Sequence, residues 1–168
     1  MPMVQHVPLG ELLVAANLLT RSQLAEALVE QQSVSLRLGS LLVNSGVVLE
    51  SNIVQILARQ LSVPWVSLRH ISVTRSLLNL ISRDVVKEHC LLPVYLRSGR
   101  SSSDILYICM DDPTDERAMR AASRDCGLPV RPLLACPSAI VDAVRTYYKI
   151  DVAPQLGARG LPTTSRVA

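Results

Sequence analysis

Arginine, glycine and glutamine residues stand at a spacing that suits ligand recognition in the N-terminal part of this 168-residue chain. Arg37 directly precedes Leu38-Gly39, and Gln60 closes the segment that Arg37 opens. An arginine offers a planar cation that can stack on a nucleobase or bind a phosphate through two N–H groups. A glycine lets backbone N–H groups approach a ligand closely, and a glutamine supplies both a donor and an acceptor. These residue types suit a ligand that carries a base or a phosphate. Taken alone, they are equally typical of two packed helical hairpins in which glycine allows a close approach at each helix start.

The same pattern occurs earlier in the chain, so residues 8–31 and 37–60 form two copies of an internal repeat. Each copy predicts a short helix, a turn and a longer helix, which gives two tandem helical hairpins. Thr20, with Gln23 three positions later, forms a capping box at the start of the second helix. The matched positions are Leu9 and Leu38, Gly10 and Gly39, Leu13 and Leu42, Leu19 and Val48, Leu24 and Ile53, Leu28 and Leu57, and Gln31 and Gln60.

The sequence pattern changes after residue 62, where Pro64 prevents a helix from continuing. The elements expected next are an extended segment over 63–68, helices over 74–81 and 82–89, strands over 91–96 and 105–110 joined by a hairpin loop, a helix capped by Asp112, a strand over 130–135 and a helix from Pro137. The predicted fold class is α+β. A helical subdomain over 1–62 precedes a small α/β subdomain over 63–150 and a disordered tail over 151–168.

The composition indicates an aliphatic core and excludes several classes of function. Hydrophobic residues make up 49% of the chain, charged residues 18% and aromatic residues 3%. The net charge is −1 over residues 1–62 and +4 over the remainder, without a basic run or aromatics alternating with basic residues. We therefore expect no nucleic-acid binding. Because an export signal and an apolar run long enough to span a bilayer are absent, we predict a cytoplasmic chain that does not itself span a membrane.

Catalysis, a metal site and a cofactor are not predicted. The chain has no Gly-x-x-x-x-Gly-Lys-Ser/Thr sequence, so it lacks the phosphate loop of an ATPase. Asp111, Asp112 and Asp115 form a candidate metal or phosphoryl-acceptor cluster, but Asp-Pro at a helix start favours a capping role. The four cysteines have no Cys-x-x-Cys spacing and are expected to be buried thiols, at Cys90, Cys109, Cys126 and Cys136.

The repeat resembles the tandem motifs of the cyclic di-GMP-binding N-terminal domain of type II secretion and type IV pilus assembly ATPases. In that family, two tandem motifs of the form Arg-Leu-Gly-x-x-Leu-x-x-x-Gly…Leu-x-x-x-Leu-x-x-Gln wrap the ligand. The second copy here matches nearly throughout, whereas Pro8 and Asn17 replace the arginine and the second glycine of the first. The resemblance extends over residues 8–149 through three later landmarks, Leu92-Pro93-Val94, Asp112-Pro113-Thr114-Asp115 and Tyr147-Tyr148.

This resemblance implies a non-enzymatic cytoplasmic module, here without the ATPase engine, that binds cyclic di-GMP and is linked to type II secretion or type IV pilus machinery. The alternative is a nucleotide-independent docking module for an inner-membrane assembly protein of such a system, which would recruit the chain to that membrane. Pro8 and Asn17 favour docking, and the intact second motif favours sensing. The implied ligand-binding residues are Leu9, Gly10, Leu13, Gln31, Arg37, Leu38, Gly39, Leu42, Gly46 and Gln60.

The arginines between Arg97 and Arg131 allow two interpretations. They are either a solvated face of the α/β subdomain or a docking patch for an acidic partner. The sequence does not separate these alternatives.

Overall fold

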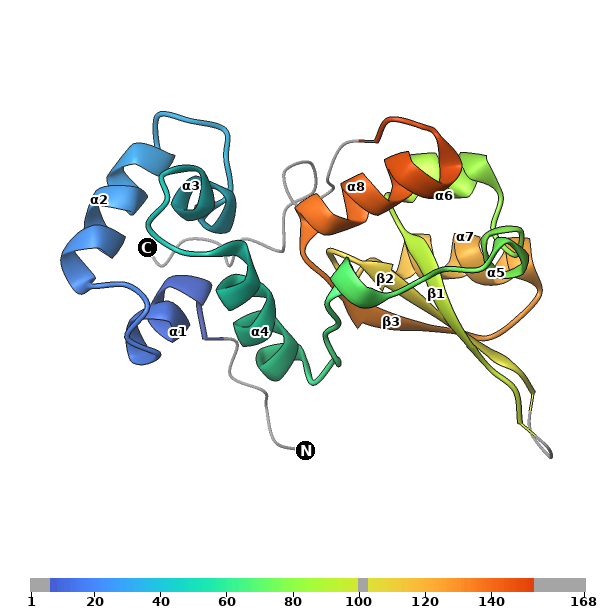
Figure 1. The fold of residues 1–168 in the computed structure, drawn as a ribbon. Coiled ribbons are helices and arrows are strands. Elements are labelled where there is room, and N and C mark those ends of the chain that lie inside the picture. The colour runs from blue at the N-terminus through green and yellow to red at the C-terminus, as the bar shows by residue number, and fades with distance from the viewer. Residues whose placement is uncertain (1–6, 100–102, 153–168) are drawn as a thin grey trace. The chain divides into compact units, whose positions relative to one another are not determined.

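The computed structural model describes residues 7–99 and 103–152, which fall into two compact units (Figure 1). The helical unit comprises described residues up to Ile53, and the α/β unit comprises those from Val54 onward. The predicted α+β fold, with tandem helical hairpins before a small α/β part, is confirmed. Of the predicted tail over 151–168, residues 153–168 lie outside the described residues.

The internal repeat is visible in the helix boundaries of the helical unit. The short helices α1 (Leu9–Ala15) and α3 (Leu38–Asn44) have the same length and start at equivalent positions of the two copies. The longer helices α2 (Arg21–Gln31) and α4 (Glu50–Leu61) also start at equivalent positions. The predicted capping box at Thr20 is present and orders the first turn of α2. The backbone therefore repeats with the sequence.

The α/β unit is built on a three-stranded sheet in the order β1-β2-β3. Strands β1 (Leu92–Arg97) and β2 (Ile105–Met110) are antiparallel, as the hairpin prediction requires, and β3 (Val130–Leu134) runs parallel to β2. Three consecutive residues of β2, Ile108 to Met110, are buried, so both faces of the central strand are covered. The connecting helices are η1 (Leu68–His70), α5 (Arg75–Leu78), α6 (Arg83–His89), α7 (Glu116–Cys126) and α8 (Pro137–Tyr148).

Three details differ from the sequence prediction. The helix predicted over 74–81 is shorter, since α5 spans only Arg75–Leu78. The cap of α7 is Asp115, whose Oδ1 accepts hydrogen bonds from the backbone N–H groups of Arg117 and Ala118. Asp112 instead accepts a bond from the Thr114 N–H, which closes a turn before the helix. The boundary between the units falls within α4, because Val54 and Ala58 pack with Leu134 of β3.

Candidate ligand-binding site

The two Leu-Gly pairs meet in the helical unit in a reciprocal arrangement. A Cβ atom placed on Gly10 would lie 2.6 Å from Leu24 Cδ1 and 3.3 Å from Leu38 Cδ2. A Cβ atom on Gly39 would lie 3.4 Å from Leu9 Cδ2 and 3.6 Å from Ile53 Cδ1. Each glycine thus faces two side chains. One belongs to its own copy of the repeat, and the other is the leucine of the Leu-Gly pair in the other copy. The structure therefore brings together the four residues that the motif predicted as the backbone platform.

The N-termini of α1 and α3 have no side-chain cap. Pro8 and Arg37 are the N-caps, and neither makes a side-chain capping bond. By contrast, Thr20 caps α2 and Ser82 caps α6 through side-chain oxygens. The first N–H groups of a helix lack intrahelical acceptors, so those of α1 and α3 need another partner, such as water or a ligand.

Arg37 is half-buried, and its Nη2 atom is buried without a hydrogen-bond partner among the described residues. Leaving a buried donor unpaired costs free energy, and the cost is larger for a charged group. An acceptor oxygen supplied from outside the chain would remove that cost. The assignment of Arg37 to ligand binding stays a prediction.

The two glutamines lie in different units. The Nε2 atom of Gln31 donates to the carbonyl oxygen of Leu36 at 3.0 Å, so this side chain anchors the residue before Arg37. Gln60 lies near the end of α4, in the α/β unit, where it is half-buried. The assignment of both glutamines to ligand binding stays a prediction.

The predicted apolar contacts are inside the helical unit. Leu13 is 0% exposed and Leu42 is 1% exposed, so both are core residues. Direct contact of either leucine with a ligand stays a prediction.

Asn17 occupies the position of the second motif glycine and keeps its backbone conformation. Asn17 has φ of 56°, and Gly46, its equivalent in the second copy, has φ of 72°. Asparagine enters this left-handed region more readily than other residues with a side chain. The replacement of the motif glycine by Asn17 therefore preserves the turn. The preference of asparagine for such turns could have indicated this from the sequence.

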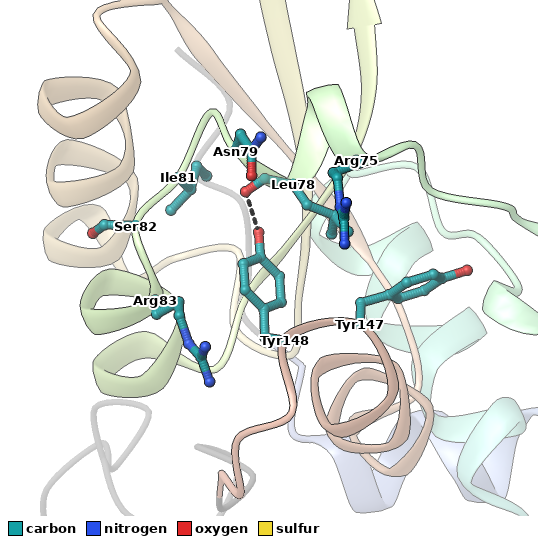
Figure 2. A pocket seen from close by; sticks show the side chains of 8 residues that line it. All are labelled: Arg75, Leu78, Asn79, Ile81, Ser82, Arg83, Tyr147 and Tyr148. Atoms are coloured by element: carbon teal, nitrogen blue, oxygen red, sulfur yellow. Dashed lines mark hydrogen bonds between the residues drawn. The ribbon is translucent and has the colours of Figure 1, made fainter.

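Two tyrosines that the sequence marked only as landmarks line a pocket of about 310 Å³ in the α/β unit (Figure 2). The Tyr148 hydroxyl donates to the carbonyl oxygen of Leu78 at 2.8 Å, as Figure 2 shows. The Tyr147 hydroxyl donates to the carbonyl oxygen of Ile71. These bonds tie the end of α8 to the segment around α5, so both hydroxyls have a structural role.

The four cysteines all lie in the α/β unit as free thiols, two of them buried and two half-buried. Burial raises the pKa of Cys90 to about 12, with a further contribution from the charge of Asp111. Burial also raises the pKa of Cys109 to about 12. Both thiols therefore stay protonated and unreactive at neutral pH. Within residues 7–99 and 103–152, no three His, Cys, Asp or Glu side chains gather in a group that could hold a metal ion.

The described helices include none that is long and apolar enough to cross a bilayer. Two units, one of tandem helical hairpins and one of a small α/β sheet, define a class of domain known from solved structures. The structure of MshE with cdg (cyclic di-GMP) matches with a TM-score of 0.67 and 29% identity, covering 85% of this chain and all of that chain. Because residues 61–168 are less than two thirds of the chain, this match must include part of residues 1–60.

The chain belongs to the MshEN domain family, whose model matches residues 61–154. The type IV pilus assembly ATPase PilB of Myxococcus xanthus is 33% identical over 140 residues, which cover 83% of this chain and 24% of PilB. Bacteriophage adsorption protein B of Escherichia coli K12 is 28% identical over 141 residues, which cover 84% of this chain and 18% of that protein. The chain thus spans about a quarter or less of these two relatives. The predicted relation to the N-terminal domain of secretion and pilus ATPases is confirmed.

Proposed function

We propose that this chain binds cyclic di-GMP through its two tandem motifs and acts as a non-enzymatic, cytoplasmic regulatory module of type IV pilus or type II secretion machinery. The observation that carries this proposal is the Nη2 atom of Arg37 at the start of the intact motif, which is buried and has no hydrogen-bond partner among the described residues. A phosphate oxygen or a guanine acceptor would satisfy this donor. The likeness to MshE, solved with cyclic di-GMP, supports the choice of ligand.

The reciprocal packing of the two copies supports a ligand with two-fold symmetry. Gly10 and Gly39 face equivalent partners, and the uncapped N-termini of α1 and α3 lie at equivalent positions of the repeat. Cyclic di-GMP has two equivalent halves, so one half would lie at each Leu-Gly pair. Only the half at the second copy would meet an arginine, because Pro8 has no donor. We therefore infer an asymmetric site with its main contact at Arg37.

Isothermal titration with cyclic di-GMP tests this proposal. Wild type should show saturable binding, and Arg37→Ala should weaken it roughly 10- to 100-fold, as expected for loss of a charge-assisted contact. Arg21→Ala is the matched control, because Arg21 is exposed in the same unit and has no partner among the described residues. Absence of binding in wild type, or an equal loss in both variants, would refute the assignment of the site.

A second candidate function is docking to an inner-membrane assembly protein of the same machinery. Apart from Trp65 and Tyr95, the exposed large apolar side chains among the described residues lie in the helical unit, at Val7, Leu28, Val29, Leu36, Val47 and Leu49. Val29 is 69% exposed and Leu49 is 68% exposed. Exposed apolar side chains are typical of protein contact surfaces when they are contiguous. Replacing Val29 and Leu49 with serine should abolish partner binding if this function holds, and should leave cyclic di-GMP affinity unchanged.

A further inference from the structure

A second pocket in the α/β unit has a volume of about 340 Å³. Two arginines and a tyrosine line part of it, one from each of the three neighbouring strands. These residues are Arg97 at the end of β1, Tyr107 in β2 and Arg131 in β3. Residues 62–64, which follow α4, also line the pocket. Arg97 and Arg131 are the first and last of the arginines for which the sequence allowed two interpretations, a solvated face or a docking patch.

The strand register places the three side chains on one face of the sheet. Tyr107 is paired with Arg131 in β3 and with Tyr95 in β1. Residues paired across strands share a face, and residues two apart along a strand share it as well. Arg97, two positions after Tyr95, therefore lies on the face of Tyr107. Because β1 and β3 flank β2, the two guanidinium groups come from opposite sides of the tyrosine ring.

The positive charge of this pocket is not neutralised within the described residues. Arg97 and Arg131 are both exposed, and their side chains make no hydrogen bond or ion pair with the described residues. Of the residues that the structure describes, none with a carboxylate lines the pocket. Other arginines of the unit are paired, such as Arg120 with Glu116 and Arg145 with Asp151. The pocket thus presents two cations that a ligand anion can approach from solvent.

The walls of the pocket are held in place by contacts of their own. The carbonyl oxygen of Pro64 accepts from the Leu134 N–H at 2.9 Å, and the Val66 N–H donates to the Leu134 carbonyl oxygen at 2.8 Å. The Tyr107 ring packs against Tyr95 with centroids 5.8 Å apart and planes inclined by 44°. The segment after α4 and the aromatic ring are therefore positioned before any ligand binds, which reduces the entropic cost of binding.

We propose that this pocket binds a nucleoside monophosphate, with the phosphate between Arg97 and Arg131 and the base against Tyr107. Guanidinium groups bind phosphate through paired N–H donors, and an aromatic ring offers a stacking surface to a base of any kind. The volume lies within the range of small-molecule sites. This pocket is in the α/β unit, whereas Arg37 and the Leu-Gly pairs are in the helical unit, so the site does not depend on the proposed cyclic di-GMP site.

Titration of the full chain with GMP, inorganic phosphate and guanosine tests the proposal. GMP should bind with saturation, phosphate more weakly and guanosine most weakly. Arg97→Ala and Arg131→Ala should each lower GMP affinity about tenfold or more. Tyr107→Leu should lower the affinity for GMP toward that for phosphate and leave phosphate binding unchanged. Melting temperatures of the variants verify that each remains folded.

Two controls separate this site from other sources of binding. Arg117→Ala removes an exposed arginine of α7 that is outside the pocket and without a partner for its side chain among the described residues, and it should leave GMP affinity unchanged. Because GMP carries the phosphate and guanine acceptors that Arg37 could also bind, Arg97→Ala and Arg131→Ala are also made in an Arg37→Ala background, where the loss of GMP affinity should be of the same size. The proposal is overturned by absence of GMP binding at millimolar concentration, by equal losses in Arg131→Ala and Arg117→Ala, or by a loss in Arg37→Ala alone. If GMP does not bind but an acidic peptide does, and its binding requires Arg97 and Arg131, the nucleotide proposal is overturned in favour of protein docking.

Discussion

In the first copy of the repeat, α1 starts at Pro8 and ends in a left-handed turn at Asn17; in the second, α3 starts at Arg37 and ends in the same turn at Gly46. The backbones agree closely. Pro8 has φ of −57° and ψ of 143°, and Arg37 has φ of −72° and ψ of 150°. The side chains do not agree, because only Arg37 carries a charge. Proline and arginine can therefore adopt the same backbone conformation at this position. Proline cannot make the contact of a guanidinium group with a ligand.

The largest expected effect comes from restoring the missing cation. Pro8→Arg should increase cyclic di-GMP affinity roughly 10- to 100-fold, because an arginine fits the observed backbone angles and adds a charge-assisted contact. Titration calorimetry measures the change. Pro8→Ala is the control, since it removes the proline ring without adding charge and should leave affinity unchanged. If Pro8→Arg and Pro8→Ala behave alike, the first copy does not contact the ligand.

A second test concerns the two glycines. Gly10→Ala should lower the free energy of unfolding by about 1–2 kcal/mol relative to Gly39→Ala. The reason is that a Cβ atom on Gly10 would lie 2.6 Å from Leu24, whereas one on Gly39 would have only ordinary contacts, beginning at 3.4 Å. Urea denaturation followed by circular dichroism measures both variants. Gly39→Ala should instead weaken cyclic di-GMP binding. Equal stability of the two variants would mean that the copies are packed alike.

The repeat explains which features could be predicted from the sequence. The tandem helical hairpins, the hairpin of β1 and β2 and the capping box at Thr20 follow from local patterns, and the structure confirms them. The packing of α4 residues against Leu134 joins distant parts of the chain, so local patterns could not show that the unit boundary falls inside a helix. The cap at Asp115 was missed because Asp112-Pro113 carries an equally good local signal.

The candidate site was predictable in residue type but not in detail. The motif marked the Leu-Gly pairs as site residues, but their contact with each other is seen only in the structure. The spacing could not show that the space beside Gly10 is tighter than the space beside Gly39, since that depends on the side chain of Leu24. It also could not show that Gln31 bonds to Leu36, because the loop between the copies has no periodic pattern.

Gln31 provides a third, smaller test. Gln31→Ala should weaken cyclic di-GMP binding by about 0.5–1.5 kcal/mol, the usual range for a neutral hydrogen bond. Part of this loss would arise indirectly, because the Nε2 atom holds the carbonyl oxygen of Leu36 beside Arg37. Gln32→Ala is the control at the adjacent exposed glutamine. A Gln31→Ala variant that binds like wild type would exclude both a contact and a positioning role for this side chain.

The smallest effect is expected at the turns that end α1 and α3. Asn17→Gly and Gly46→Asn should each change the free energy of unfolding by no more than about 0.5 kcal/mol, because both residue types adopt the left-handed conformation. Both exchanges should leave cyclic di-GMP affinity unchanged if the turn matters only through its backbone. Asn17→Ala is the informative comparison, since alanine has no local hydrogen bond to offset positive φ and should cost about 1 kcal/mol. A loss of affinity in Gly46→Asn without loss of stability would show that the second copy needs a bare glycine at the ligand. In that case Asn17, as much as Pro8, would account for the weaker first copy.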